Sequence, residues 1–145
     1  MLKQIFLVLV AMLLAARANA FDDSNVGTYA LIHKDGHVTD SVFFVSKANG
    51  AWQLEQRNKN GDWSNVTCER DCVLSISRES DIERFIPSHV RQQSDFQCIH
   101  NSAFAFCKYV TRADAKKGGF TLIALVTKTP TPIFLKKLST SRVTP

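Results

Sequence analysis

The sequence lacks the short motifs that mark the commonest catalytic sites. It has no Gly-x-Ser-x-Gly turn, no His-Glu-x-x-His pair and no glycine-rich loop of the kind that binds phosphates. These absences exclude the motif-defined classes of serine hydrolase, zinc protease and nucleotide-binding protein. We therefore predict a protein that is not an enzyme, with no catalytic residue and no cofactor.

The sequence also lacks internal repeats, linkers and low-complexity segments, and its 145 residues are about one domain's worth. A multidomain enzyme is excluded by this length, and a disordered chain is excluded by the abundance of Phe, Val, Ile and Leu. One folded domain is expected.

A long apolar run is missing except at the N-terminus, where residues 5–14 are ten uninterrupted apolar residues. A membrane-spanning helix needs about twenty, so this run is too short for an anchor. Lys3 before the run and the sequence Ala-Asn-Ala at residues 18–20 are typical of a cleaved signal peptide. We predict that residues 1–20 are a signal peptide and that residues 21–145 form a single exported β-rich domain, periplasmic or extracellular. The residue after the predicted cut is phenylalanine rather than cysteine, so the protein is not predicted to be a lipoprotein.

Four cysteines are present, and all follow the predicted signal peptide: Cys68, Cys72, Cys98 and Cys107. An even number in an oxidising compartment predicts two disulfides. Loop entropy gives about 2 and 2.7 kcal/mol for the two sequential bonds and about 3.7 kcal/mol for each crossed bond, so it favours the crossed pairings, whereas neighbouring cysteines are joined first during export. We predict the sequential pairing, Cys68–Cys72 and Cys98–Cys107. A zinc site is the alternative, but neither pair has the two-residue knuckle spacing and no matched histidine pair stands nearby.

Turn dipeptides separate short β-branched and aromatic runs in the first half of the exported part. Asp35-Gly36, Asn49-Gly50 and Asn60-Gly61 are typical of hairpin turns. The fold class predicted is α+β, mostly antiparallel β in a meander of hairpins, with one short helix and two disulfides.

The short helix is expected near residues 80–86. Ser80 followed by Glu83 is typical of a capping box, and Pro87 ends the helix. The polar residues 88–97 are expected to form a loop.

Further strands are predicted at residues 73–77, 103–111 and 120–126, and a last strand is predicted to start at residues 133–135. A helix remains an alternative for residues 103–111, and residues 120–126 are the most apolar run and are expected to be a central strand. The prolines at positions 130 and 132 are expected to interrupt the sheet. Alternate residues on the apolar face of each predicted strand are expected to be buried. These are Phe44, Trp52, Phe104, Phe106, Leu122, Ala124 and Val126.

Four histidines are candidates for metal binding or base chemistry. His33 and His37 are four residues apart with Asp35 between them. Because a hairpin tip is predicted there, the two imidazoles are expected to point apart, and no metal site is predicted. His89 and His100 are isolated and are expected to be surface or loop residues.

A hydrolase with paired carboxylates is the main enzymatic alternative. Spacing does not select a pair from its five candidates, which are Asp22, Asp23, Glu55, Glu69 and Asp71.

Charge is unevenly distributed along the chain. Residues 21–107 carry eight basic and twelve acidic side chains, whereas residues 108–145 carry eight basic and one acidic. Such a concentration of one sign attracts an acidic partner or an anionic surface, and the alternative is that lysines protect edge strands from association. The candidate contact surface consists of Lys116, Lys117, Lys128, Lys136 and Lys137. Nucleic acid is not a predicted partner, because the protein is expected to be exported and its basic segment lacks interleaved aromatic residues.

These observations predict a small exported binding protein, stabilised by disulfides, that acts as an inhibitor or immunity-type protein by recognising another protein. The alternatives are a cell-envelope hydrolase that uses carboxylates and an envelope structural or assembly factor with a basic surface. The predicted partner is another protein. If the basic residues 108–145 make the contact, we expect this protein to be acidic. An anionic envelope surface is the alternative partner.

Overall fold

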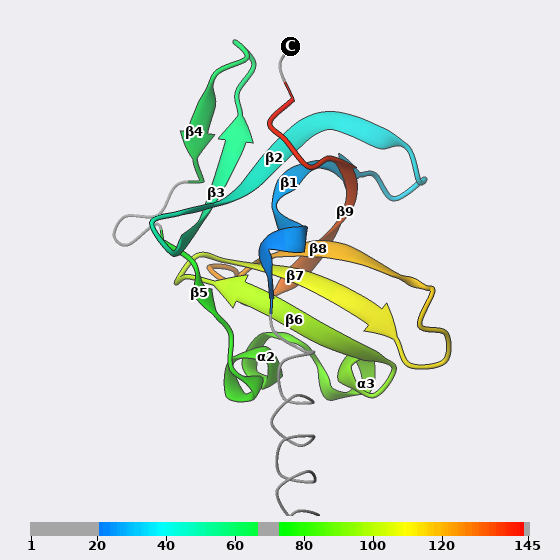
Figure 1. Cartoon of the computed structure of the whole chain (residues 1–145). Helices are drawn as coiled ribbons and strands as arrows, with labels where there is room; N and C mark the ends of the chain where they lie inside the picture. The colour runs from blue at the N-terminus through cyan, green and yellow to red at the C-terminus, as the bar shows by residue number, and fades with distance from the viewer. Residues whose placement is uncertain (1–20, 67–72, 144–145) are drawn as a thin grey trace, which may run out of the picture.

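The computed structural model describes residues 21–66 and 73–143, and strands dominate this part of the chain (Figure 1). The strands are β1 (Gly27–Ile32), β2 (Val38–Ala48), β3 (Ala51–Arg57), β4 (Trp63–Asn65), β5 (Ser75–Ile76), β6 (Ser94–His100), β7 (Phe104–Thr111), β8 (Gly118–Ala124) and β9 (Thr131–Ser139). Every neighbouring pair is antiparallel, and the order across the sheet is β4-β3-β2-β1-β9-β8-β7-β6-β5. The predicted antiparallel meander is therefore confirmed.

The sheet consists of two meanders joined by its first and last strands. Strands β1–β4 follow one another along the chain, as do β5–β9, and β9 returns to pair with β1. A single bridge between Trp52 and Leu74 connects β3 to the residue before β5. This bridge brings the two ends of the sheet together, so the sheet curls around one interior.

The inner face of the curled sheet holds the main hydrophobic core. Its buried members are Phe21, Tyr29, Phe43, Val45, Trp52, Leu54, Leu74, Ile99, Phe106, Leu122 and Leu135. Aromatic rings meet edge to face at its centre, with Tyr29 4.9 Å from Phe106 and 4.8 Å from Phe120 between ring centroids. Each fully buried side chain of this kind stabilises the fold by about 1.5–3 kcal/mol relative to an exposed one.

Helix α2 (Glu79–Phe85) and the single turn of α3 (Ser88–Arg91) cover the outer face of β6 and β7 (Figure 1). A second cluster forms beneath them, in which Ile82, Phe85 and Ile86 pack against alternate residues of β6, β7 and β8. The predicted Cys98–Cys107 disulfide is confirmed and lies in this cluster, joining directly opposed positions of β6 and β7. Cys68 and Cys72 lie outside the described residues.

Helix α2 begins one residue earlier than predicted and uses a different cap. The Arg78 amide donates to the Asp81 carboxylate at 2.9 Å, so Asp81 rather than Glu83 reaches back to the start of the helix. The expected capping box on Ser80 is thus wrong by two residues, although the predicted short helix is present.

Several further expectations need correction. Residues 88–97 are not a loop, because they contain α3 and the start of β6. Phe44 is only half-buried, since the buried phase of β2 carries Phe43 and Val45 instead. Phe104, at the start of β7, and Ala124, at the end of β8, are also only partly buried. Val126 lies after the end of β8 and is 73% exposed. Pro132 does not interrupt the sheet but pairs with Ile123 near the start of β9, beyond the part of β9 that pairs with β1.

The C-terminal residues 139–143 form a strap over β1 and the neighbouring outer face. The buried Thr28 hydroxyl donates to the Ser141 carbonyl at 2.7 Å and accepts from the Val143 amide at 3.2 Å. Arg142 forms an ion pair with Glu55, and its guanidinium lies 4.9 Å from the ring of Phe44 and 5.5 Å from that of Trp63. The N-terminal meander is therefore covered by polar and cation–π contacts on its outer face. None of the described helices is long and apolar enough to cross a membrane.

Candidate functional site

A groove with a volume of about 660 Å³ lies along β6, next to the start of α2. Five consecutive β6 residues, 94–98, line it. Because successive side chains of a strand point to opposite faces, a groove lined by five in a row follows the edge of the strand rather than one face. The groove exists because β5 is only two residues long and pairs with β6 at Ile99 and His100 alone.

The backbone of β6 presents hydrogen-bonding groups to this groove. The Cα atoms of Cys98 and Cys107 are 4.1 Å apart, the short separation of a pair that exchanges no backbone hydrogen bonds. The N–H and C=O groups of Cys98 and Phe96 therefore point away from β7. The Cys98 carbonyl accepts from the Ser77 amide at 2.9 Å. Within residues 21–66 and 73–143, no strand pairs with Phe96 on this side.

Apolar and charged side chains share the walls of the groove. Phe21, Ile76 and Val110 supply apolar surface, and Ile76 is 53% exposed. Arg112 contacts the Asp95 carboxylate through two nitrogens at 2.9 Å each. An open strand edge with apolar surface and charges of both signs suits an extended peptide, which supplies backbone donors and acceptors at strand spacing.

Ser77 and His100 meet beside this groove in a contact that the sequence did not indicate. The Ser77 hydroxyl lies 2.8 Å from His100 Nδ1, and His100 Nε2 lies 3.9 Å from the Asp81 carboxylate. The three residue types are those of a hydrolytic triad, but a triad requires a hydrogen bond between the base and its carboxylate, and 3.9 Å is too long for one. The Asp81 carboxylate instead accepts from the Arg78 amide, and this hydrogen bond is the largest cause that holds the pKa of Asp81 below its usual value. The Ser77–His100 contact therefore connects the residues just before α2 to β6.

The N-terminal residues of the described chain close one end of the interior next to the groove. Phe21 is 3% exposed and packs edge to face on Trp52 and Phe106, at centroid distances of 4.8 and 5.8 Å. Lys137 donates to the Ser24 carbonyl at 2.6 Å, and its ammonium lies 5.7 Å from the Tyr29 ring. Burial is the main cause that lowers the pKa of Lys137, and the nearby charge of Lys108 adds to the effect. Lys137 therefore holds the N-terminal segment against the core.

The five lysines of the predicted contact surface come from two turns and one strand. Lys116 and Lys117 are in the turn between β7 and β8, whereas Lys128 is in the turn at the other end of β8. Lys136 and Lys137 are consecutive on β9, so their side chains point to opposite faces of the sheet. The structure brings no more than two of these lysines together in one turn.

The described carboxylates proposed for a hydrolase each have a different partner. Asp22 accepts from Ser24, and the hydrogen bonds from this serine are the main cause that lowers the pKa of Asp22. Asp23 pairs with Lys47 at 3.2 Å, and Glu55 pairs with Arg142. Glu69 and Asp71 lie outside the described residues.

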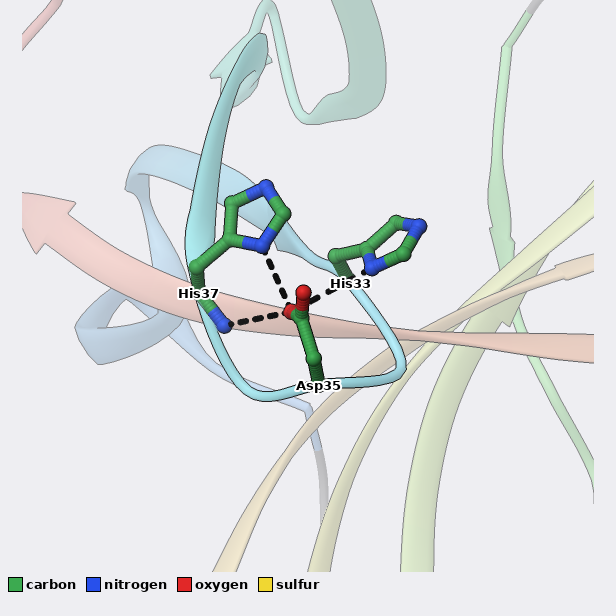
Figure 2. A group of neighbouring side chains, drawn as sticks. All are labelled: His33, Asp35 and His37. Carbon is green, nitrogen blue, oxygen red and sulfur yellow. Dashed lines mark hydrogen bonds and ion pairs between the residues drawn. The ribbon is translucent and has the colours of Figure 1, made fainter.

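A second arrangement of chemical interest lies at the exposed tip of the β1–β2 hairpin (Figure 2). The imidazole rings of His33 and His37 are stacked, with centroids 4.9 Å apart and an interplanar angle of 28°. Both face the carboxylate of Asp35, with Nδ1 of His37 at 2.5 Å and Nδ1 of His33 at 3.2 Å from the same oxygen. The expectation that the hairpin would point the two imidazoles apart is wrong. Hydrogen bonds from the His37 amide and ring hold the pKa of Asp35 below its usual value, with the amide as the larger cause.

No known protein family, curated protein sequence or solved structure matches this chain.

Proposed function

We propose that this protein is a small exported binding protein of the inhibitor or immunity type, which recognises another protein by adding one of its extended segments to the open edge of β6. The observation that carries the proposal is the groove itself, in which the backbone of β6 around Phe96, which no described strand pairs with on this side, lies between apolar and charged side chains. A strand added there continues the sheet, so its backbone forms ladder hydrogen bonds and its alternate side chains contact the groove walls.

The surroundings of β6 support recognition by a rigid edge. The Cys98–Cys107 disulfide joins β6 to β7, and α2 covers the outer face of the same strands. An edge held in place before binding loses little conformational entropy when a partner adds to it. Export is inferred from residues 1–20, and the oxidising compartment that it implies suits this disulfide.

The test uses two matched variants at exposed apolar positions. Ile76→Asp places a charge in the groove, whereas Val126→Asp places the same charge in the turn between β8 and β9. Both side chains are more than half exposed, so each variant should change the free energy of unfolding by less than about 0.5 kcal/mol. The immobilised protein is exposed to an extract of the cell envelope, and any captured protein is identified and purified.

We expect the wild type and Val126→Asp to bind the purified partner equally, and Ile76→Asp to lose at least about tenfold in affinity, since a charge is buried against apolar surface. Amide exchange at Phe96 should slow in the complex. Equal binding by both variants contradicts the proposal. So does hydrolysis of the partner that is lost in Ser77→Ala, which would assign the Ser77–His100 contact to catalysis.

A further inference from the structure

The tip of the β1–β2 hairpin places two imidazoles side by side through its turn geometry. The His33 amide donates to the His37 carbonyl and the Gly36 amide donates to the His33 carbonyl, both at 2.9 Å. Gly36 has φ of 90°, the left-handed conformation that ends a three-residue hairpin loop. With only three residues in the loop, His33 and His37 are cross-strand neighbours, whose side chains lie on the same side of the hairpin.

Asp35 lies within this loop and its side chain turns back toward the pair. Its carboxylate accepts from the His37 amide at 3.1 Å, so the backbone of the turn fixes its direction. Figure 2 shows the carboxylate between the two rings. The imidazole and carboxylate donor atoms of the three residues all lie within 4.8 Å of one another. The contacts that place the three ligands side by side therefore lie within residues 33–37.

These distances suit a metal ion. Zinc binds imidazole nitrogen and carboxylate oxygen at about 2.0–2.2 Å, which places neighbouring ligands of a tetrahedral site about 3.3 Å apart. The His33–Asp35 distance of 3.2 Å already matches this value, and small rotations of exposed side chains adjust the other two. The three side chains are 56–63% exposed, so water can supply the remaining ligands.

We propose that His33, Asp35 and His37 form a surface site for a late divalent transition-metal ion, of the copper and zinc class. Two imidazoles and one carboxylate favour these ions over Mg²⁺ and Ca²⁺, which prefer sites made of oxygen alone. Copper should bind more tightly than zinc, as it does at most nitrogen and oxygen sites. The hairpin tip is not part of the groove along β6, so this site and the proposed peptide site are independent.

The experiment is titration of the purified protein, without a histidine tag, with Cu²⁺ and with Zn²⁺ by calorimetry. We expect one ion for each chain, tighter binding of Cu²⁺, and an electron paramagnetic resonance spectrum of the copper form with two equatorial imidazole nitrogens. Loss of an outer-shell hydrogen bond to a ligand already costs 10–100-fold in affinity, so His33→Ala and His37→Ala should each lose at least about tenfold.

Two control variants separate the site from other donors. His89→Ala removes an exposed histidine in α3 and should leave affinity unchanged. Asp35→Asn keeps an oxygen that can accept from the His37 amide but removes the charge, so it should weaken binding while the melting temperature without metal stays the same. Binding that survives removal of both His33 and His37, or that Mg²⁺ displaces as readily as Zn²⁺, overturns the proposal.

Discussion

The outer faces of the two meanders are covered in different ways. On the C-terminal meander, the apolar side chains of α2 and the segment after it pack on β6, β7 and β8 around a disulfide. On the N-terminal meander, the strap of residues 139–143 lies over β1 and contributes backbone hydrogen bonds to Thr28 and a guanidinium between two aromatic rings. The first cover works by removing apolar area from water, and the second by polar contacts that remain partly exposed. Loss of the helical cover should therefore destabilise the protein more than loss of the strap.

The largest effect is expected from truncating the apolar cover. Phe85 is buried in the cluster beneath α2, and Phe85→Ala should lower the free energy of unfolding by about 3–5 kcal/mol, because it leaves a cavity that the neighbours only partly fill. Chemical denaturation measures the loss. Glu83→Ala, at an exposed position of the same helix, is the control and should change stability by less than about 0.5 kcal/mol. Equal losses in the two variants would show that α2 does not contribute through burial.

Removing the disulfide should have the next largest effect. The Cys98–Cys107 bond closes a ring of ten residues, because its cysteines are nine positions apart. Loop entropy then gives about 2.7 kcal/mol for the double variant Cys98→Ala and Cys107→Ala. Urea unfolding of the variant against the wild type tests this value. A loss under about 1 kcal/mol would mean that the unfolded state of the variant keeps residual β6–β7 pairing, so that the disulfide restricts it little further.

The strap should contribute less. Arg142→Ala removes one partly exposed ion pair and two cation–π contacts, and should lower the free energy of unfolding by about 0.5–1 kcal/mol. Arg142→Lys keeps the charge but loses the planar guanidinium, so it should recover only part of the loss. A loss as large as that of Phe85→Ala would overturn the comparison between the two covers.

The smallest effect is a dependence of α2 on pH. The Asp81 carboxylate accepts from the Arg78 amide, and this hydrogen bond, with smaller contributions from the charges of His100, Arg84 and Arg78, lowers the pKa of Asp81 in the folded protein. A lowered folded pKa means that the stabilisation is present above the unfolded value of about 3.9 and is lost as the pH falls through the folded pKa. Melting temperatures measured through this acid range should fall less steeply in Asp81→Asn than in the wild type. Parallel curves would show that the cap does not titrate on unfolding.

The sequence predicted strands best where apolar residues alternate with others or form a continuous run. Strand β7 was predicted from the alternation of large and small residues, and β8 from its continuous apolar run. Strand β6 was missed because Asp95 and Gln97, which precede Ile99 on the inner phase, are polar and line the groove. The polar residues that line the groove thus interrupt the apolar alternation that would otherwise have predicted β6. In β2, four consecutive apolar residues left the buried phase undecided, and the structure buries Phe43 and Val45 rather than Phe44.

The two candidate sites differ in how much of them the sequence contains. The hairpin tip is coded by five consecutive residues, 33–37, and the turn that Gly36 allows was recognised. Its consequence for the histidines was missed, because a three-residue loop pairs residues four apart rather than separating them. The groove forms because β5 ends just before α2 begins. The position of this end depends on packing across the sheet, and no short sequence motif marks it. The opposite orientations of Lys136 and Lys137 were within reach, since consecutive residues of a strand always point to opposite faces.

The pairing of β9 with β1 has a consequence for the order in which the chain folds. Each hairpin within a meander joins neighbours in sequence and can form early, whereas Thr28 finds its partner Ser139 only after nearly the whole chain is available. Until then β1 has an unpaired edge and the aromatic interior is open to water. Because this long loop is entropically costly to close, we expect the β1–β9 pairing to form late, and a chain halted before residue 131 to expose a strand edge that can pair with other chains. Pairing of β9 with β1 should therefore remove the edge through which incomplete chains would associate.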